Sequence, residues 1–239
     1  MTAFTVALIG PDGAGKTTIG RRLEKSLPLP VRYLYMGVNA EASNALLPTT
    51  RVLRAIRRRR GAPPQGGPPD PRPTARERRG GVRDALREAR SLLRLAHRLS
   101  EEWFRQALAW YHVSRGRVVL FDRHFFADYY AYDVSAKPRR SASRRLHGFV
   151  LSRLYPRPDL AIYLDAPAEI LLERKGEGTL ESLERRRREY LELGKILQQF
   201  AIVDASRPLD MVTREVADLI AAFSERRRPG VPHAERSRS

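Results

Sequence analysis

One loop near the start of the chain limits the possible folds more than any other feature. Residues 9–18 read Ile-Gly-Pro-Asp-Gly-Ala-Gly-Lys-Thr-Thr and contain the pattern G-x-x-x-x-G-K-[ST] without a gap. An apolar run at residues 4–9 precedes the loop, and an amphipathic segment at residues 16–26 follows it. A strand before this pattern and a helix after it are the context in which it forms a phosphate-binding loop. We therefore predict a P-loop at residues 10–17.

The residue types of this loop indicate what it binds. Glycines allow the backbone to approach phosphate oxygens closely, and the N-terminus of the following helix favours negative charge. Lys16 is expected to reach the β- and γ-phosphates of ATP, and the Thr17 hydroxyl is expected to bind Mg²⁺. The predicted ATP-binding residues of the loop are Gly10, Gly13, Gly15, Lys16, Thr17 and Thr18.

Apolar runs alternate with amphipathic segments along the rest of the chain. Short buried strands are predicted at residues 4–9, 31–36, 117–122, 160–165 and 200–205. Helices are predicted at residues 16–26, 82–115, 124–133, 141–154, 168–175, 180–197 and 208–226. Strands that alternate with helices in this way form a parallel sheet. The expected fold is an α/β P-loop NTPase with a five-stranded parallel sheet and helices on both faces.

Positive charge is concentrated in two segments that contain few aliphatic side chains. The formal net charge is +18, and residues 51–81 hold ten arginines against Asp70 and Glu77. An insertion rich in Arg and Pro at residues 57–81 and a basic tail at residues 226–239 bury too little apolar surface to offset their ordering entropy. We therefore predict one folded domain over residues 1–225, a mobile insertion within it and a disordered tail after it.

Other features of the composition bear on the compartment. The chain has no cysteine, no apolar run that approaches the length of a membrane span, and no basic region before the short apolar stretch at its start. These features exclude disulfides and thiolate zinc sites, and they do not match a signal peptide or a membrane helix. The prediction is a cytoplasmic protein that does not enter a membrane.

The third predicted strand ends in Asp122 followed by Arg123. An ATPase that activates water usually has glutamate after this aspartate, and a GTPase needs an Asn-Lys pair, which the sequence lacks. An arginine beside the aspartate instead suits a second anionic substrate. The pair therefore predicts phosphoryl transfer to a bound acceptor.

Several ordered motifs together resemble those of the thymidylate kinase family of nucleoside monophosphate kinases. The motifs are "GPDGAGKTT" at residues 10–18, "FDRHFFADYYAYD" at 121–133, "RPDLAIYLDAPAEILLERKGEG" at 157–178, "RRREYLELGK" at 186–195 and "FAIVDASRPLDMVTREVADLI" at 200–220. The similarity covers most of residues 1–27 and 117–223. It implies a kinase that transfers the γ-phosphoryl group of Mg·ATP to a small acceptor.

The resemblance also implies roles for individual residues. Asp12 faces a sugar hydroxyl of the acceptor or an ordered water, and Arg123 clamps the acceptor phosphate. Asp122 lies near the Mg²⁺ that Thr17 binds, or it orients the acceptor oxygen. Arg174 stacks on adenine. A lid at about residues 175–190 closes over the site, and the arginine run at residues 185–188 leaves open which of its members acts. The predicted catalytic residues are Lys16, Asp122, Arg123 and Arg185.

The acceptor side of the chain departs from the family pattern. The loop after the second strand reads "YLYMGVNAEASNALLP" at residues 33–48, where the family has a different motif. The predicted acceptor-binding residues are Asp12, Asn39, Arg123 and Tyr132. A nucleoside monophosphate such as dTMP is the leading acceptor, and a nucleoside, a sugar or another metabolite is the alternative. A weaker alternative is an ATP-dependent nucleic-acid-binding protein that uses the basic insertion. An apolar stripe on the helix at residues 82–115 is expected to pack against the sheet or against a second subunit in a homodimer.

Overall fold

The computed structural model describes residues 3–37, 43–59, 82–134, 142–176 and 178–227. Most of the predicted insertion, most of the predicted tail and Asn39 lie outside these ranges. The side chain of Tyr132 also lies outside the described part, although its backbone is described. The predictions that fall on these residues therefore stay predictions.

The centre of the molecule is a five-stranded sheet in which every pair of neighbouring strands is parallel. Its strands are β1 (Thr5–Ile9), β2 (Val31–Tyr35), β3 (Val118–Asp122), β4 (Leu160–Asp165) and β5 (Phe200–Asp204). The strand order is β2-β3-β1-β4-β5. All five strands were predicted from the sequence, and the expected parallel α/β fold is confirmed.

The register of the sheet brings two predicted motifs together. Strand β1 pairs with β3 on one side, where Leu8 lies opposite Asp122, and with β4 on the other, where Ile9 lies opposite Tyr163. The loop that follows β1 therefore begins beside the end of β3. In open parallel sheets, ligands bind outside the carboxyl ends of the strands, so this register indicates where the site should form.

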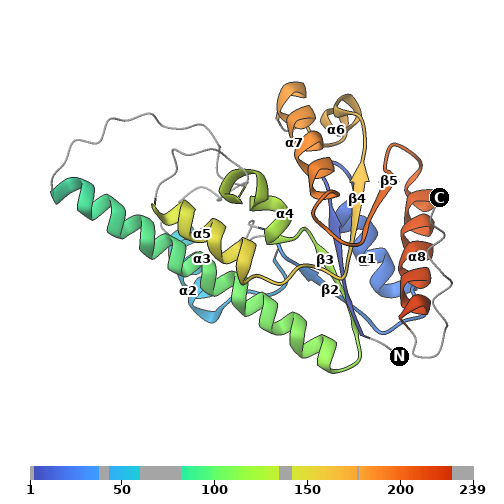
Figure 1. Cartoon of the computed structure of the whole chain (residues 1–239), viewed down its shortest axis with the longest axis horizontal. Helices are drawn as coiled ribbons and strands as arrows, with labels where there is room; N and C mark the ends of the chain where they lie inside the picture. The colour runs from blue at the N-terminus through green and yellow to red at the C-terminus, as the bar shows by residue number, and fades with distance from the viewer. Residues whose placement is uncertain (1–2, 38–42, 60–81, 135–141, 177, 228–239) are drawn as a thin grey trace.

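Helices cover both faces of the sheet (Figure 1). They are α1 (Lys16–Ser26), α2 (Pro48–Arg59), α3 (Val82–Ser114), α4 (Phe125–Tyr129), α5 (Ala142–Arg153), α6 (Ala168–Lys175), α7 (Leu180–Leu193) and α8 (Leu209–Arg226). A π-helical turn, η1 (Tyr130–Val134), follows α4 directly.

Alternate residues of the central strand enter two separate hydrophobic clusters. Val6 and Leu8 pack with side chains of α1, α6 and α8, whereas Ala7 and Ile9 pack with side chains of α3, α4, α5 and α7. Side chains of a strand point alternately to the two faces of the sheet, so a strand covered on both sides is apolar at every position. This explains why the strands appear in the sequence as continuous apolar runs.

One helix was not predicted. Helix α2 runs from Pro48 to Arg59, so the first three residues of the predicted insertion, 57–59, are helical. An arginine-rich composition is compatible with a helix, because arginine is a good helix former and proline is favoured in the first turn of a helix. The start of the insertion is corrected accordingly.

The longest helix, α3, has 33 residues and extends beyond the sheet, with α5 beside it (Figure 1). Its apolar stripe is only partly buried. Leu95 and Ala109 are in the core, but the side chains of Trp110 and Tyr111 are 48% and 51% exposed. The stripe thus packs against the protein over part of its length, and the homodimer stays a prediction. None of the helices in the described ranges is both long and apolar enough to cross a membrane.

Candidate active site

The P-loop connects β1 to α1 and takes a conformation that needs glycine at three positions. Gly10, Gly13 and Gly15 all have positive φ angles, of 146°, 90° and 84°. A Cβ atom on Gly10 would lie 2.6 Å from the carbonyl oxygen of Leu164, and one on Gly13 would lie 2.7 Å from that of Leu171. Glycine is required here because of both the backbone angles and the close approach of neighbouring backbone.

We expect Gly10→Ala to lower the free energy of unfolding by about 2–4 kcal/mol, because it adds a steric overlap to a strained φ angle. Gly116→Ala is the matched control, since Gly116 also has a positive φ, of 75°, but a Cβ atom there would meet no atom within 4 Å. That variant should lose only about 1–2 kcal/mol. Urea unfolding followed by circular dichroism measures both values, and equal losses would contradict the steric explanation.

Lys16 is the first residue of α1, and its side chain folds back into the P-loop. Its Nζ donates hydrogen bonds to the carbonyl oxygens of Gly10, at 2.8 Å, and Pro11, at 2.6 Å. Only 5% of the residue is exposed. Burial lowers the pKa of Lys16 to about 8, and the nearby charge of Arg123 adds to this effect. The ammonium group therefore lies where a phosphate would meet the loop. Thr18 is exposed in the same first turn of α1.

Thr17 and Asp122 were predicted as the metal pair, and they are in direct contact. The Thr17 hydroxyl donates to Oδ2 of Asp122 at 2.5 Å, and the hydroxyl of Tyr33 donates to the same oxygen at 2.6 Å. Asp122 is fully buried, and its other carboxylate oxygen, Oδ1, has no hydrogen-bond partner among the described residues. A buried carboxylate oxygen without a partner is costly, which indicates that something else satisfies it.

This arrangement fits a magnesium ion. Mg²⁺ is usually bound by one or two protein oxygens together with the phosphates of its nucleotide and water. The hydroxyl of Thr17 and the carboxylate of Asp122 are such ligands, and they lie beside the P-loop. Among the described residues there is no cluster of three or more His, Asp or Glu side chains that could hold a metal without the nucleotide.

Arg123 follows Asp122 in an unusual backbone conformation, with a φ of 68°. Its amide N–H donates to the carbonyl oxygen of Leu8 at 3.0 Å, which holds the turn against β1. The guanidinium forms an ion pair with Asp12 of the P-loop. Burial alone would raise the pKa of Asp12, but the charges of Arg123 and Lys16 hold it below the usual value. A left-handed non-glycine residue is strained, and such residues concentrate at functional sites.

The structure adds Asp128 to this group, which the sequence analysis did not select. Asp128 lies on α4, is buried, and accepts a hydrogen bond from the hydroxyl of Tyr190 on α7 at 3.1 Å. Burial raises the pKa of its carboxyl, and the positive charges of Arg123, Arg186 and Lys16 oppose that rise. Residues of the P-loop, of β3, of α4 and of α7 therefore interact within one site.

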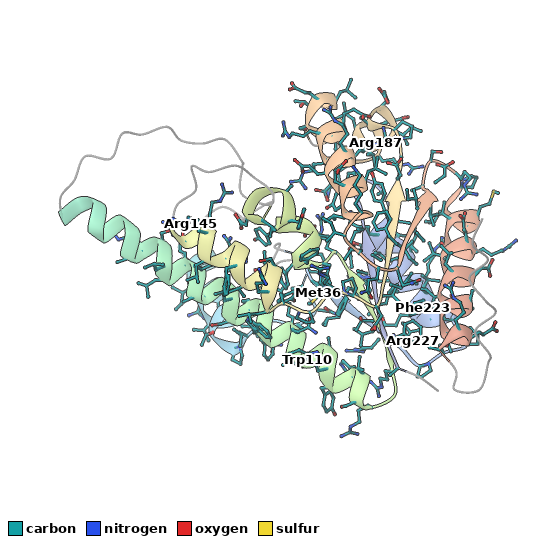
Figure 2. The ribbon with its side chains drawn as sticks, viewed as in Figure 1. Met36, Trp110, Arg145, Arg187, Phe223 and Arg227 are labelled. Atoms are coloured by element: carbon teal, nitrogen blue, oxygen red, sulfur yellow. The ribbon has the colours of Figure 1, made fainter. Side chains whose placement is uncertain are left out.

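The arginines of the predicted lid differ in the residues with which they interact. Arg187 forms a bidentate ion pair with Asp165 at the end of β4, with distances of 2.8 Å and 2.9 Å, and it lies above that strand in Figure 2. Arg185, the predicted catalytic member, is exposed and lies 4.0 Å from Glu189 one turn away. Arg186 acts electrostatically on both Asp12 and Asp128. Of these three, Arg186 is therefore the one that acts on Asp12, a predicted acceptor residue, and on Asp128.

Arg174, predicted to meet adenine, lies near the end of α6 and contacts the loop after β5. Its Nη1 donates to the carbonyl oxygen of Ala205 at 2.7 Å, and its Nη2 to that of Ser206 at 3.2 Å. The N–H of Ala205 in turn donates to the carbonyl oxygen of Asp165 at 2.6 Å. Arg174 is thus held at the carboxyl end of β4 and β5.

The loop after β2 also reaches the site, through Gly37. A Cβ atom on Gly37 would lie 2.4 Å from both Cδ of Arg123 and the hydroxyl of Tyr35. The carbonyl oxygen of Gly37 accepts a hydrogen bond from the buried Arg105 of α3 at 2.7 Å. The preceding residue, Met36, is fully buried, and Figure 2 shows it between the sheet and the layer of α3 and α5. The described part of the predicted acceptor loop is therefore packed against Arg123.

A phosphate-binding loop at the centre of a parallel sheet, with a threonine and an aspartate in contact beside it, defines the class of the molecule: it is an α/β P-loop protein. No protein-family model matches the chain.

Comparison with known proteins shows what the chain is similar to. The chain is 30% identical to thymidylate kinase of Thermosipho africanus over 118 residues, 32% identical to a probable thymidylate kinase of Archaeoglobus fulgidus over 118 residues, and 31% identical to thymidylate kinase of Pseudoalteromonas translucida over 126 residues. Each match covers 46% of this chain and 57% of the other protein, so the chain spans little more than half the length of these curated relatives. The chain is similar to these thymidylate kinases over that part of its length, which supports the resemblance that its motifs indicate.

Proposed function

We propose that the protein is a kinase that transfers the γ-phosphoryl group of Mg·ATP to a small acceptor, and that this acceptor is a nucleoside monophosphate such as dTMP. One observation carries the proposal. Asp122 accepts a hydrogen bond from Thr17 of the P-loop through one oxygen, while its other, buried oxygen has no partner in the part of the chain that the structure describes. This pairing is the one that a P-loop kinase needs for its metal and nucleotide.

The donor side is built from the P-loop and the ends of β4 and β5. The backbone N–H groups of the loop and the N-terminus of α1 bind the phosphates, and Lys16 moves from its bonds with Gly10 and Pro11 onto them. Arg174 binds the adenine, close to the loop after β5. Thr17 and Asp122 would hold Mg²⁺, which when bound would supply charge neutralisation to the phosphates.

The acceptor side is built around Arg123. In the structure its guanidinium is paired with Asp12. When the acceptor is bound, its phosphate forms an ion pair with the guanidinium of Arg123, and the Asp12 carboxylate turns to a hydroxyl group of the acceptor. Asp128 lies behind Arg123 and holds it electrostatically. Catalysis then consists of positioning and of charge neutralisation, without a covalent enzyme intermediate.

We propose that Arg186, in place of Arg185, is the lid arginine that stabilises the transferring group. Arg186→Ala should lower kcat by about 100-fold, as expected for the loss of one preorganised donor. Arg188→Ala is the control, because Arg188 lies exposed on the same helix, and it should change kcat by less than about two-fold. Steady-state kinetics of these variants and of Arg185→Ala make the comparison. A large loss of kcat in Arg185→Ala alone would restore Arg185 as the catalytic residue.

The same chemistry on a nucleoside, a sugar or another metabolite is the second candidate. It is favoured by the sequence of the loop after β2, which departs from the family motif; Gly37 of this loop accepts a hydrogen bond from the buried Arg105 of α3. A coupled assay of ADP release over dTMP, dUMP, UMP, CMP, AMP and GMP, followed by nucleosides and sugars, separates the candidates. Turnover on dTMP above all others supports the first. Turnover only on an acceptor that is not a nucleotide would establish the second.

A further inference from the structure

Three buried titratable side chains form a cluster away from the P-loop. His147 of α5 lies between Asp133 of η1 and Glu102 of α3. Its Nδ1 is 2.7 Å from Oδ2 of Asp133, and its Nε2 is 3.2 Å from both carboxylate oxygens of Glu102. None of the three side chains is more than 1% exposed. Three segments that are distant in the sequence therefore meet at one imidazole ring.

The geometry defines the charge state of this ring. A neutral histidine has one N–H donor, whereas both of its ring nitrogens are donors when it is protonated. Both nitrogens of His147 face carboxylate oxygens, so an imidazolium satisfies both contacts. Burial would lower the pKa of His147, but the hydrogen bonds with Asp133 and Glu102 outweigh it and raise the pKa above its usual value.

The surroundings of the cluster are also charged or aromatic. The ring of Tyr129 on α4 meets that of His147 edge-on, with 4.8 Å between the ring centres. The guanidinium of Arg98 on α3 lies 5.1 Å from the centre of the Tyr129 ring. On α5, Arg144 forms an ion pair with Asp133 at 3.2 Å. These are the charged and titratable groups that α3, α4, η1 and α5 present around the imidazole.

The cluster is connected to the acceptor side through α4. Asp128 of the site and Tyr129 of the cluster are consecutive residues of this helix, and η1, which contains Asp133, continues it directly. A single π-helical turn within or after an α-helix is a costly local arrangement that is often found at functional sites. The contact between Asp133 and His147 ties this turn to α5 and α3.

We propose that His147 is a positioning residue for the acceptor: held between Glu102 and Asp133, it fixes the π-helical turn η1 and thereby the orientation of Asp128 and Arg123. This inference rests on the proposed function, which places Asp128 and Arg123 beside the acceptor. The imidazolium acts through the backbone of α4 and η1 and does not touch the substrate.

Kinetics of His147→Gln test the proposal, because the substitution removes the cation that lies between the two buried carboxylates. The KM for the acceptor should rise about ten-fold, and the KM for ATP should change by less than about two-fold. His112→Gln, at the far end of α3, is the control and should change neither. Adding Glu102→Gln to His147→Gln removes one of the two opposed charges, so the double variant should recover much of the acceptor KM. Equal rises in both KM values, or no recovery in the double variant, would overturn the proposal.

Two measurements on the nucleotide-free protein test the role of His147 independently of whether the protein is a kinase. The NMR signal of His147 Cε1 should be that of an imidazolium at pH 7. Because the pKa of His147 is raised in the folded protein, its stabilising effect is complete below the unfolded value of about 6.5 and is lost as the pH rises through the folded value. The free energy of unfolding should fall over that range in the parent protein but not in His147→Gln. A neutral His147 at pH 7 would overturn the proposal.

Discussion

Replacing Lys16 by alanine is expected to lower kcat by about 10²–10³-fold or more, the range for a single preorganised donor to developing charge. The ammonium group is buried in the P-loop and bonded to the carbonyl oxygens of Gly10 and Pro11. It is the cation closest to where the loop receives phosphates, and no other described lysine lies in this loop. Because burial lowers the pKa of Lys16 to about 8, kcat/KM for ATP in the parent protein should also fall as the pH rises through about 8.

The substitution Lys16→Met provides the control for packing, since it keeps most of the side-chain volume and removes only the charge. Both variants should lose activity to a similar extent while retaining the circular dichroism spectrum of the parent. Steady-state kinetics with Mg·ATP between pH 6 and 10 supply the values. Normal turnover by either variant would show that Lys16 does not act on the transferred phosphate.

Asp122→Asn should also lower kcat/KM, by about 10²–10³-fold, because it removes the charge that the metal needs while keeping the shape of the side chain. Asp122 is fully buried and accepts hydrogen bonds from Thr17 and Tyr33 through one oxygen. Higher concentrations of Mg²⁺ should restore part of the activity of the variant if the metal site is weakened.

Tyr33→Phe is the comparison for Asp122→Asn. It removes a hydrogen bond to the same carboxylate oxygen but leaves the charge in place. It should therefore lower kcat/KM by less than about ten-fold, in keeping with the loss of one hydrogen bond to a charged group. Titration of activity with MgCl₂ gives the apparent metal affinity of each protein. An unchanged affinity in Asp122→Asn would remove Asp122 from the metal site.

The strands and the P-loop were predicted because their signals are local. Each strand is a continuous apolar run, which a sheet covered on both faces requires. The spacing of the glycines at positions 10 and 15 is that of a phosphate-binding loop. The contact between Thr17 and Asp122 also follows from the fold, since Thr17 lies in the first turn of α1, after the loop that follows β1, and Asp122 ends the neighbouring strand β3. The parallel topology therefore gives much of the donor side of the candidate site.

The remaining parts of the candidate site depend on how a helix is rotated about its axis and on contacts between residues that are distant in the sequence. A sequence does not reveal either. Four consecutive arginines point in different directions around α7, and only the structure separates Arg187, paired with Asp165, from Arg186. The cluster at His147 joins residues 14 and 45 positions apart. Asp128 did leave a signal: it is an acidic residue within the aromatic stretch of α4, and a carboxylate in an otherwise buried segment usually has a partner or a function.

The most direct test of the proposed function is to follow the transferred phosphoryl group. We would mix the full chain with Mg·ATP and dTMP and record the ³¹P NMR spectrum over time. The proposal predicts that the signals of ADP and of a new nucleoside diphosphate appear together in equal amounts, and that neither appears with Lys16→Ala. Release of inorganic phosphate without a new diphosphate, or no change in ATP with dTMP and every other acceptor, would contradict it.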